Sequence, residues 1–245
     1  MGLNIIKERK YRFKGFTLAE VLITLGVIGV VAAVTMPTLV QNYKKHIVET
    51  RLAKFYTTMN EAIRMSETVN GDKMYWEDIG HGFEKDEEGN VDKTKSIPLA
   101  WFNKYLRPYL NGANIEVNNL AGDVMIYFND GSLCLLSQFA LHYYPNAKDF
   151  MEYKVLENGQ LANNAEISGI KSFVFLFRPY NKQVKYHYKK GVEPYKAGGW
   201  NGTKEMLLNS SNIGCNENAT NERAYCTALI QMNGWKIPKD YPFKF

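Results

Sequence analysis

A long apolar run near the N-terminus is the most prominent pattern in the chain. Between Phe16 and Val40 the only ionisable side chain is that of Glu20. A helix over this stretch is roughly 37 Å long, more than the bilayer hydrocarbon core of about 30 Å, so the pattern predicts a transmembrane helix. A cleavable secretory signal is the competing interpretation. It is disfavoured because its apolar region is usually only about 7–15 residues long, and no small-x-small cleavage site precedes Pro37.

Beyond Pro37 the helix is predicted to continue with an amphipathic pattern to about Val69, where Asn70-Gly71 is a typical helix end. Apolar and small residues spaced alternately four and three apart form one stripe along it. A coiled-coil dimer would use such a stripe, but a helix packed on the sheet of its own domain is the favoured interpretation. The stripe consists of Val48, Leu52, Phe55, Met59, Ala62, Ser66 and Val69.

Residues 71–120 lack a long periodicity, and their glycines predict loops. Pro98–Arg107 predicts one short helix with its proline near the first turn. The charged run Glu84–Glu88 lacks the alternating ligand spacing of a calcium loop, so a solvated charge run is favoured over a metal site.

Strand patterns follow in the second half of the chain. Val124–Phe128 and Ser132–Leu136 flank a turn in which Asp130-Gly131 supplies positive φ angles, which predicts a β-hairpin. Ser172–Phe177 predicts a buried strand, and the alternation over Val184–Lys189 predicts another. One long helix followed by antiparallel strands indicates an α+β domain.

The net charge of +5 is concentrated at the N-terminus. Residues 1–15 contain five basic side chains against Glu8, which leaves the rest of the chain nearly neutral. Attraction to nucleic acid is therefore a poor interpretation of the whole protein. Basic residues are sparser after the apolar run, so the positive-inside rule places the N-terminus in the cytoplasm and the later residues outside. The five basic residues are Lys7, Arg9, Lys10, Arg12 and Lys14.

Glu20 is costly in a membrane span, by about 2.5–3.5 kcal/mol if it reaches the centre. It either lies near the edge and reaches water, or it has a positive partner. Cleavage between Gly15 and Phe16 would create such a partner, because the new α-amino group would lie about one helical turn from the carboxylate.

Residues 14–20 read KGFTLAE and follow a short basic leader. This segment closely resembles the class III signal of type IV pilins and type II secretion pseudopilins. The resemblance implies that a prepilin peptidase cleaves after Gly15 and methylates the amino group of Phe16, and that Glu20 is a carboxylate used in assembly. It further implies a pilin-like α+β fold, packing against other pilin or pseudopilin subunits through the N-terminal helices, and contact with membrane lipid and an inner-membrane assembly platform.

The expected organisation is a leader peptide at 1–15, a transmembrane helix at 16–40, an amphipathic helix at 41–70 and an extracytoplasmic α+β domain at 71–245. The protein would be a single-pass protein of the bacterial inner membrane until it enters a filament. Related pseudopilins often carry a calcium loop before their last strands, but the comparable stretch Glu157–Lys171 is poor in carboxylates, so no metal is expected there.

Cys215 and Cys226 flank a polar, turn-forming segment. In an oxidising compartment outside the membrane we expect them to form a disulfide, worth about 3 kcal/mol in the chain-entropy model. A terminal cysteine loop is also common among the pilins that the chain resembles. Cys134 lies in an apolar strand pattern, where a buried small hydrophobic residue is favoured over a reactive thiol.

The segment Arg178–Lys196 alternates basic residues with tyrosines and contains one acidic residue, Glu193. This composition suits nucleic-acid binding, but it also suits a solvated edge strand protected by lysines, which is the favoured interpretation. The sequence contains no nucleophile elbow, zinc-protease, phosphate-loop or Cys-x-x-Cys motif, so an enzyme and a cofactor are not expected. The four histidines are scattered and are interpreted as surface or packed residues.

Two functions fit these observations. The first is a structural subunit, a minor or specialised member of a type II secretion pseudopilus or type IV pilus-like filament. The alternative is a membrane-displayed adhesin or DNA-binding module that uses the pilin signal for display.

Overall fold

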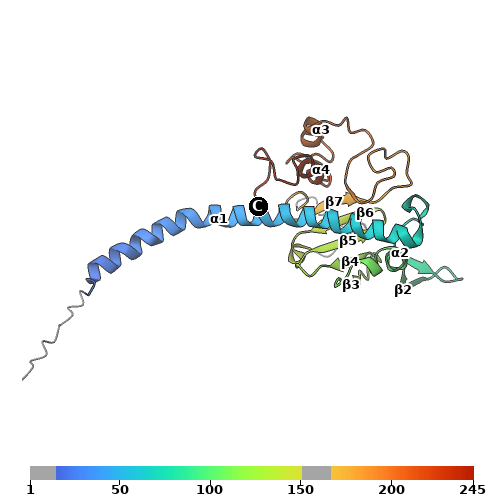
Figure 1. Cartoon of the computed structure of the whole chain (residues 1–245), viewed down its shortest axis with the longest axis horizontal. Helices are drawn as coiled ribbons and strands as arrows, with labels where there is room; N and C mark the ends of the chain where they lie inside the picture. The colour runs from blue at the N-terminus through green and yellow to red at the C-terminus, as the bar shows by residue number, and fades with distance from the viewer. Residues whose placement is uncertain (1–14, 151–166) are drawn as a thin grey trace, which may run out of the picture. The chain divides into compact units, whose positions relative to one another are not determined.

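A computed structural model describes residues 15–150 and 167–245 of the chain (Figure 1). The chain divides into two units, of which the second runs from Lys44 to Phe245 and contains every strand. The helix α1, Leu18–Asn70, begins in the first unit and ends in the second. The expected long N-terminal helix is confirmed to within two residues at each end.

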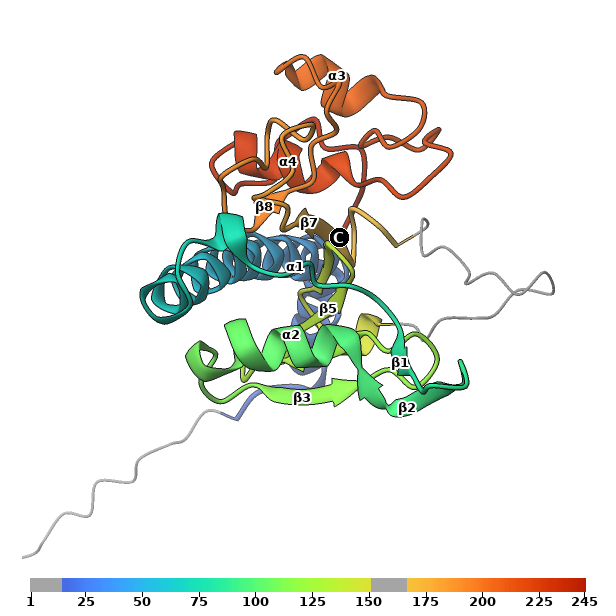
Figure 2. The same ribbon diagram turned by 90° about the vertical axis from the view of Figure 1, so that its right-hand side faces the viewer.

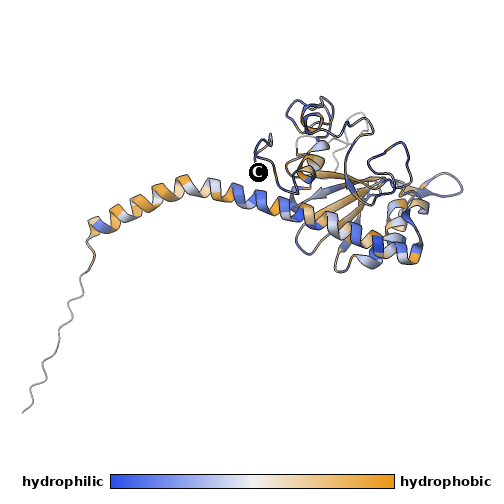
Figure 3. Ribbon diagram, turned by 45° about the horizontal axis from the view of Figure 1, so that its top comes forward, coloured by the Kyte–Doolittle hydropathy of each residue, from blue (hydrophilic) through white to orange (hydrophobic). Residues whose placement is uncertain are grey.

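The two halves of α1 differ in character, as Figure 3 shows by their colours. Large apolar side chains in the first half are exposed, for example Leu25 and Ile28. In the second half the predicted stripe is buried from Val48 to Ser66, whereas Val69 is 75% exposed. Gly71 follows the helix with a φ of +74°, a conformation that suits glycine at a helix end.

The second unit contains a six-stranded antiparallel sheet in which the strands follow one another in chain order. The predicted hairpin and the strand at Ser172–Phe177 are confirmed as β4–β5 and β7. The strands β3 and β6 and the two-residue strand β8 were not predicted. The strands are β3 Asn114–Val117, β4 Val124–Tyr127, β5 Leu133–Ser137, β6 Ala140–Tyr144, β7 Phe173–Leu176 and β8 Glu193–Pro194.

The β4–β5 turn differs from the expected one in detail. Gly131 has a φ of +80°, but Asp130 is not among the residues with positive φ. The Asp130 carboxylate instead accepts hydrogen bonds from the backbone N–H and the hydroxyl of Ser132, at 3.1 and 2.6 Å. The aspartate therefore stabilises the turn through its side chain.

Several short elements lie between α1 and the sheet. It contains η1 (Lys73–Tyr75), an unpredicted β1–β2 hairpin (Phe83–Lys85 and Val91–Ser96), α2 (Ile97–Tyr105) and η2 (Arg107–Tyr109). The helix α2 fulfils the prediction at Pro98–Arg107, and its N-cap Ser96 accepts the Leu99 N–H. The acidic run forms the hairpin turn, where Asp86 accepts the N–H groups of Glu88 and Asn90.

The predicted strand at 184–189 is wrong. The N–H of His187 donates to the carbonyl of Val184 at 2.8 Å, and the N–H of Lys190 donates to the carbonyl of His187 at 3.0 Å. These bonds over three residues form successive turns rather than a strand ladder. The side-chain alternation was misleading, because His187, expected on the lysine face, is completely buried.

The core lies between α1 and one face of the sheet, so the helix packs on its own domain as predicted. The Phe55 ring on α1 stacks on Tyr143 of β6 at 4.2 Å between centroids and contacts Phe175 of β7 at 5.0 Å. Viewed from the Asn70 end of α1, the C-terminal helices α3 (Lys204–Asn209) and α4 (Tyr225–Met232) lie on one side and α2 on the other (Figure 2).

A buried carboxylate ties α1 to the C-terminal segment. Glu49 accepts the backbone N–H of Ile237 at 2.9 Å, and the ammonium group of Lys236 lies 3.1 Å from its other oxygen. Only 9% of the Glu49 side chain is exposed. The end of the chain is therefore fixed to the helix by polar contacts as well as by apolar packing.

Candidate functional site

The predicted cleavage junction lies at the start of α1. Gly15 and Phe16 precede the helix in exposed positions, and 87% of the Phe16 surface is accessible. No described atom lies within 4 Å of the place that a side chain at Gly15 would occupy. The bond between these two residues is thus free of packing within the described part of the chain.

Thr17 and Glu20 form a capping box at this helix start. The Glu20 carboxylate accepts the backbone N–H and the hydroxyl of Thr17, at 2.8 and 2.9 Å, while the N–H of Glu20 donates to the Thr17 hydroxyl at 3.2 Å. A capping box satisfies N–H groups that a helix leaves without partners in its first turn. The sequence analysis missed this arrangement, although a threonine followed three residues later by glutamate before an apolar run signals it.

The capping box gives Glu20 local partners in the uncleaved chain. Thr17 is the residue that would directly follow a new N-terminus at Phe16. A carboxylate and an amino group would then be present within the first helical turn, where opposite charges attract strongly in a medium of low polarity.

The helix α1 is long and apolar enough to cross a membrane, judged by its length and composition. Its most apolar part is not buried within the protein. Pro37 lies inside the helix without ending it. The N-terminal part thus has the properties of a single-pass membrane anchor.

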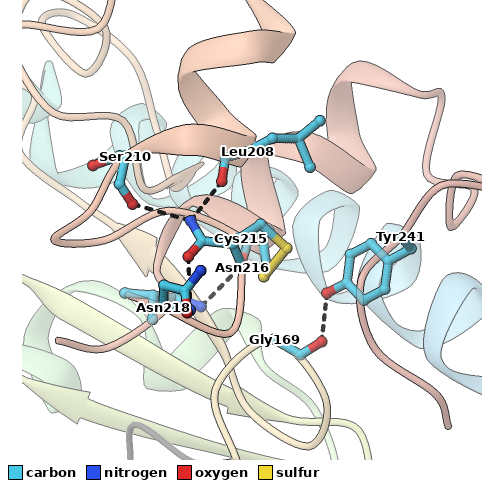
Figure 4. The surroundings of a disulfide bond; sticks show 10 residues. Gly169, Leu208, Ser210, Cys215, Asn216, Asn218 and Tyr241 are labelled. Carbon is cyan, nitrogen blue, oxygen red and sulfur yellow. Dashed lines mark hydrogen bonds between the residues drawn. A yellow bond between two sulfur atoms is a disulfide. The ribbon is translucent and has the colours of Figure 1, made fainter. Parts of the chain in front are cut away.

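The second candidate region is the C-terminal layer that contains α3, α4 and the disulfide between Cys215 and Cys226. The sulfur atoms of Cys215 and Cys226 lie 2.06 Å apart, at bonding distance (Figure 4). The Asn216 side-chain amide beside them donates to the carbonyls of Leu208 and Ser210, at 2.5 and 3.1 Å. The bridge and this amide together connect α3, the loop after it and the start of α4.

The disulfide packs closely on the turn before β7. A Cβ atom added at Gly169 would lie 2.4 Å from the Cys226 sulfur, so only glycine fits there. The carbonyl of Gly169 accepts a hydrogen bond from the Tyr241 hydroxyl, as Figure 4 also shows. On α4, the hydroxyl of Thr227 accepts the N–H of Val174 at 2.9 Å, which attaches the layer to β7.

Cys134 lies on β5 and is completely buried. Burial raises the pKa of its thiol, because the thiolate would lose its hydration. The geometry is that of a packed core residue.

The basic segment Arg178–Lys196 is mostly a packed lobe of turns. Glu193–Pro194 within it form β8, an edge strand of the sheet that is buried rather than solvated. The centre of the lobe is His187, whose Nε2 lies 3.2 Å from the Lys196 backbone nitrogen and whose Nδ1 is buried without a hydrogen-bond partner among the described residues. Burial lowers the pKa of His187 to about 4, assisted by nearby cations that include Lys190. The histidine is therefore neutral at physiological pH. Lys190 beside it is exposed, whereas only 11% of the Lys196 side chain is accessible.

His142 has the opposite electrostatic environment. Its Nδ1 lies 3.1 Å from a carboxylate oxygen of Glu222, in the disulfide loop. Burial alone would lower the pKa of His142, but attraction to Glu222 and Asp123 outweighs it and raises the pKa. This pair was missed because its members lie far apart in the sequence.

A search for groups of three or more possible metal ligands finds none within 15–150 and 167–245. Most of the stretch Glu157–Lys171, compared above with the calcium loop of pseudopilins, lies outside the described residues, as does nearly all of the leader at 1–15.

Comparisons with known proteins divide the chain at the middle of α1. Residues 10–36 match the model of the prokaryotic N-terminal methylation motif, and residues 38–245 match the model of a family of unknown function. No curated protein and no solved structure matches the chain. The first match supports a prepilin-type signal and a pilin-like membrane subunit processed by prepilin peptidase. The second covers most of the chain, which therefore belongs to the family of unknown function DUF6613.

Proposed function

We propose that this protein is a minor or specialised structural subunit of a type II secretion pseudopilus or type IV pilus-like filament. The observation that carries the proposal is the methylation motif at residues 10–36, which ends within an apolar helix that continues into a separately packed domain. A filament subunit needs these parts in this order: a processing signal, an anchor that becomes the fibre core, and a domain for the fibre surface. The size of the second unit favours a specialised subunit.

In the proposed pathway the basic residues at 1–15 remain in the cytoplasm, residues 16–40 span the inner membrane, and residues 71–245 lie outside it. Prepilin peptidase cleaves after Gly15 and methylates Phe16. The mature subunit stays in the membrane until the assembly platform extracts it. Its apolar helix surface, exposed in the monomer, then packs against the helices of neighbouring subunits.

Mass spectrometry of the protein isolated from its native membrane tests the first step. We expect a mature N-terminal peptide that begins at Phe16 and carries one methyl group on its α-amine. A Gly15→Lys variant should keep the leader, because the peptidase requires a small residue before the cut. Residues 1–15 still attached to the parent protein, in cells with active prepilin peptidase, would refute the proposal.

The structural role is tested by imaging filaments with an antibody against the second unit. Labelled filaments that disappear when the Gly15→Lys variant replaces the parent would support a subunit. If the protein were displayed only as a membrane-anchored monomer and retained affinity for a ligand, the adhesin alternative would replace the proposal.

A further inference from the structure

An open cavity of about 570 Å³ lies between the end of α1 and the basic lobe at Arg178–Lys196. One wall is the turn that contains η1, and the other is formed by the lobe. Both walls carry lysine and tyrosine side chains. The cavity is lined by Asp72, Lys73, Tyr75, Lys182, Tyr188 and Lys189, together with Met74.

A hydrogen bond joins the two walls. The hydroxyl of Tyr180 donates to the Asp78 carboxylate at 2.5 Å, which joins the lobe to the segment after η1. On the lobe side, the N–H of Lys189 donates to the carbonyl of Pro179 at 2.8 Å. Lys189 has a φ of +61°, a costly conformation for a residue with a side chain. The lysine is therefore held at the cavity by the fold of the lobe.

The charges around the cavity are unevenly satisfied. Lys73 is paired with Glu67 at 2.8 Å. Asp72 accepts the N–H of Met74 but keeps its negative charge, which offsets one of the cavity's lysines. Lys182 and Lys189 are exposed and have no carboxylate within 4.0 Å in the described part of the chain. Glu193, the one acidic residue of the lobe, is buried and faces Tyr56, so it does not neutralise the surface.

Tyr75 is exposed without an evident packing role. Its surface is 88% accessible, and within the described residues its ring stacks on no other aromatic ring. The neighbouring Trp76 is buried and stacks on Tyr105, which fixes the backbone from which Tyr75 projects. Tyr188, on the opposite wall, presents a second ring, with the Lys189 ammonium group 5.5 Å from its centroid.

We propose that this cavity binds single-stranded nucleic acid without sequence preference. Lys182 and Lys189 would contact phosphates, while Tyr75 and Tyr188 would stack on bases, the combination by which proteins hold single strands. An acidic polysaccharide fits less well, because no amide side chain lines the cavity to bind sugar hydroxyls. The inference goes beyond the filament role and does not depend on it.

The test uses the full-length protein in a zwitterionic detergent and a fluorescein-labelled oligonucleotide of fifteen thymidines. Fluorescence anisotropy should show binding that weakens as salt rises from 50 to 200 mM, with a log–log slope of roughly −0.7 for each phosphate contacted. The double variant Lys182→Gln, Lys189→Gln should weaken binding at least about tenfold and flatten the slope by about 1.4.

Matched variants separate the cavity from general charge. Lys85→Gln with Lys93→Gln removes the same charge from exposed positions on the β1–β2 hairpin and should leave binding within about twofold of the parent. Tyr75→Ala should weaken binding about tenfold without changing the salt slope, and Tyr75→Phe should restore it, since stacking needs only the ring.

Four results would overturn the assignment. The first is no binding to the oligonucleotide at 50 mM salt, and the second is equal loss in the hairpin and cavity lysine variants. The third is unchanged binding by Tyr75→Ala. The fourth is displacement of the oligonucleotide by alginate at lower concentrations than unlabelled oligonucleotide requires, which would identify an acidic polysaccharide as the ligand class.

Discussion

At the residue scale, two buried polar side chains of the second unit, Glu49 and His187, have opposite electrostatic environments. Both are removed from solvent. The carboxylate of Glu49 has an ammonium group and a backbone N–H as partners. The imidazole of His187 is surrounded by cations and stays neutral. The contacts of Glu49 could not be predicted from the sequence, because its partners lie near the end of the chain.

Replacing Glu49 with alanine should destabilise the protein. The change leaves the Ile237 N–H without its acceptor, and an unsatisfied buried group costs about 1–3 kcal/mol. At about 2–4 °C per kcal/mol for a domain of this size, the melting temperature should fall by roughly 2–12 °C. Differential scanning fluorimetry of the full-length protein in detergent measures the melting temperature. The control is Glu61→Ala, an exposed carboxylate 4.0 Å from Arg64, and equal shifts in both variants would contradict the role of Glu49.

His187 should make stability depend on pH. Its pKa is about 4 in the folded protein and about 6.5 when unfolded, so the unfolded state takes up the proton first and stability falls as pH drops below 6.5. Between pH 6.5 and 5.0 the parent should lose about 1.5 kcal/mol more than His187→Phe, because the dependence reaches its full slope of about 1.36 kcal/mol per pH unit only below pH 6.5, where the unfolded histidine becomes fully protonated.

Urea unfolding at a series of pH values measures this difference. His142, whose raised pKa acts in the opposite direction, is present in both proteins and cancels from the comparison. His81→Gln, a change at an exposed histidine, should follow the parent. Parallel stability curves for the parent and His187→Phe would show that His187 is not the titrating group.

At the element scale, elements with a long or simple pattern were predictable, and those defined by tertiary contacts were not. The helix α1 and the β4–β5 hairpin follow from periodicity and from one turn. The strand β8 has only two residues, and β3 begins in a polar segment, so neither carries a pattern of its own. The lobe around His187 was misread because alternation is also compatible with successive turns when a buried side chain decides the conformation.

The capping box and the His142–Glu222 pair mark two further limits at the candidate sites. The capping box could have been predicted from the spacing of Thr17 and Glu20, but the sequence analysis missed it. The His142–Glu222 pair joins a central strand to a loop eighty residues later, and only the fold brings these groups together. The cavity at Tyr75 could not be predicted for the same reason, because its two walls lie about a hundred residues apart in the sequence.

Thiol labelling should distinguish the three cysteines. In the folded protein from its native compartment none should react with iodoacetamide, because Cys134 is buried with a raised pKa and the other two are bridged. Denaturation without reductant should expose one reactive thiol, in the peptide containing Cys134. Denaturation with reductant should expose three.

Peptide mapping identifies the labelled residues, and a Cys134→Ala variant, which should show no thiol before reduction, is the control. Label on Cys215 or Cys226 before reduction would contradict the bridge. If the bridge is present, the Cys215→Ser, Cys226→Ser variant should be less stable by about 3 kcal/mol.

At the scale of the whole molecule, the chain combines a prokaryotic N-terminal methylation motif with a domain from a family without assigned function. The processing signal ends near residue 36 and the family model begins at residue 38, in the middle of one helix. The role of the domain therefore has to be inferred from its own surface, whereas the role of the N-terminus follows from a few residues. Glu20 is the residue by which two proposed roles of the N-terminus, anchoring and assembly, can be separated.

Replacing Glu20 with valine should separate membrane insertion from assembly. The change makes the span more apolar, so insertion and cleavage after Gly15 should continue. Under the proposed function, the amino group of an incoming Phe16 would pair with Glu20 of a subunit already in place and would set the axial register of helices that otherwise slide on apolar surfaces. The variant should therefore accumulate as processed protein in the membrane and fail to enter filaments.

The experiment requires cells without a wild-type copy, and it compares membrane and sheared-filament fractions by immunoblotting. Thr17→Val is the matched control, because it removes the hydroxyl of the capping box and keeps the carboxylate. That variant should be processed and should enter filaments, since the charge pair forms without the hydroxyl. Incorporation of the Glu20→Val protein at the parent's level would exclude a registration role, and Glu20 would then be a carboxylate tolerated at the edge of the span.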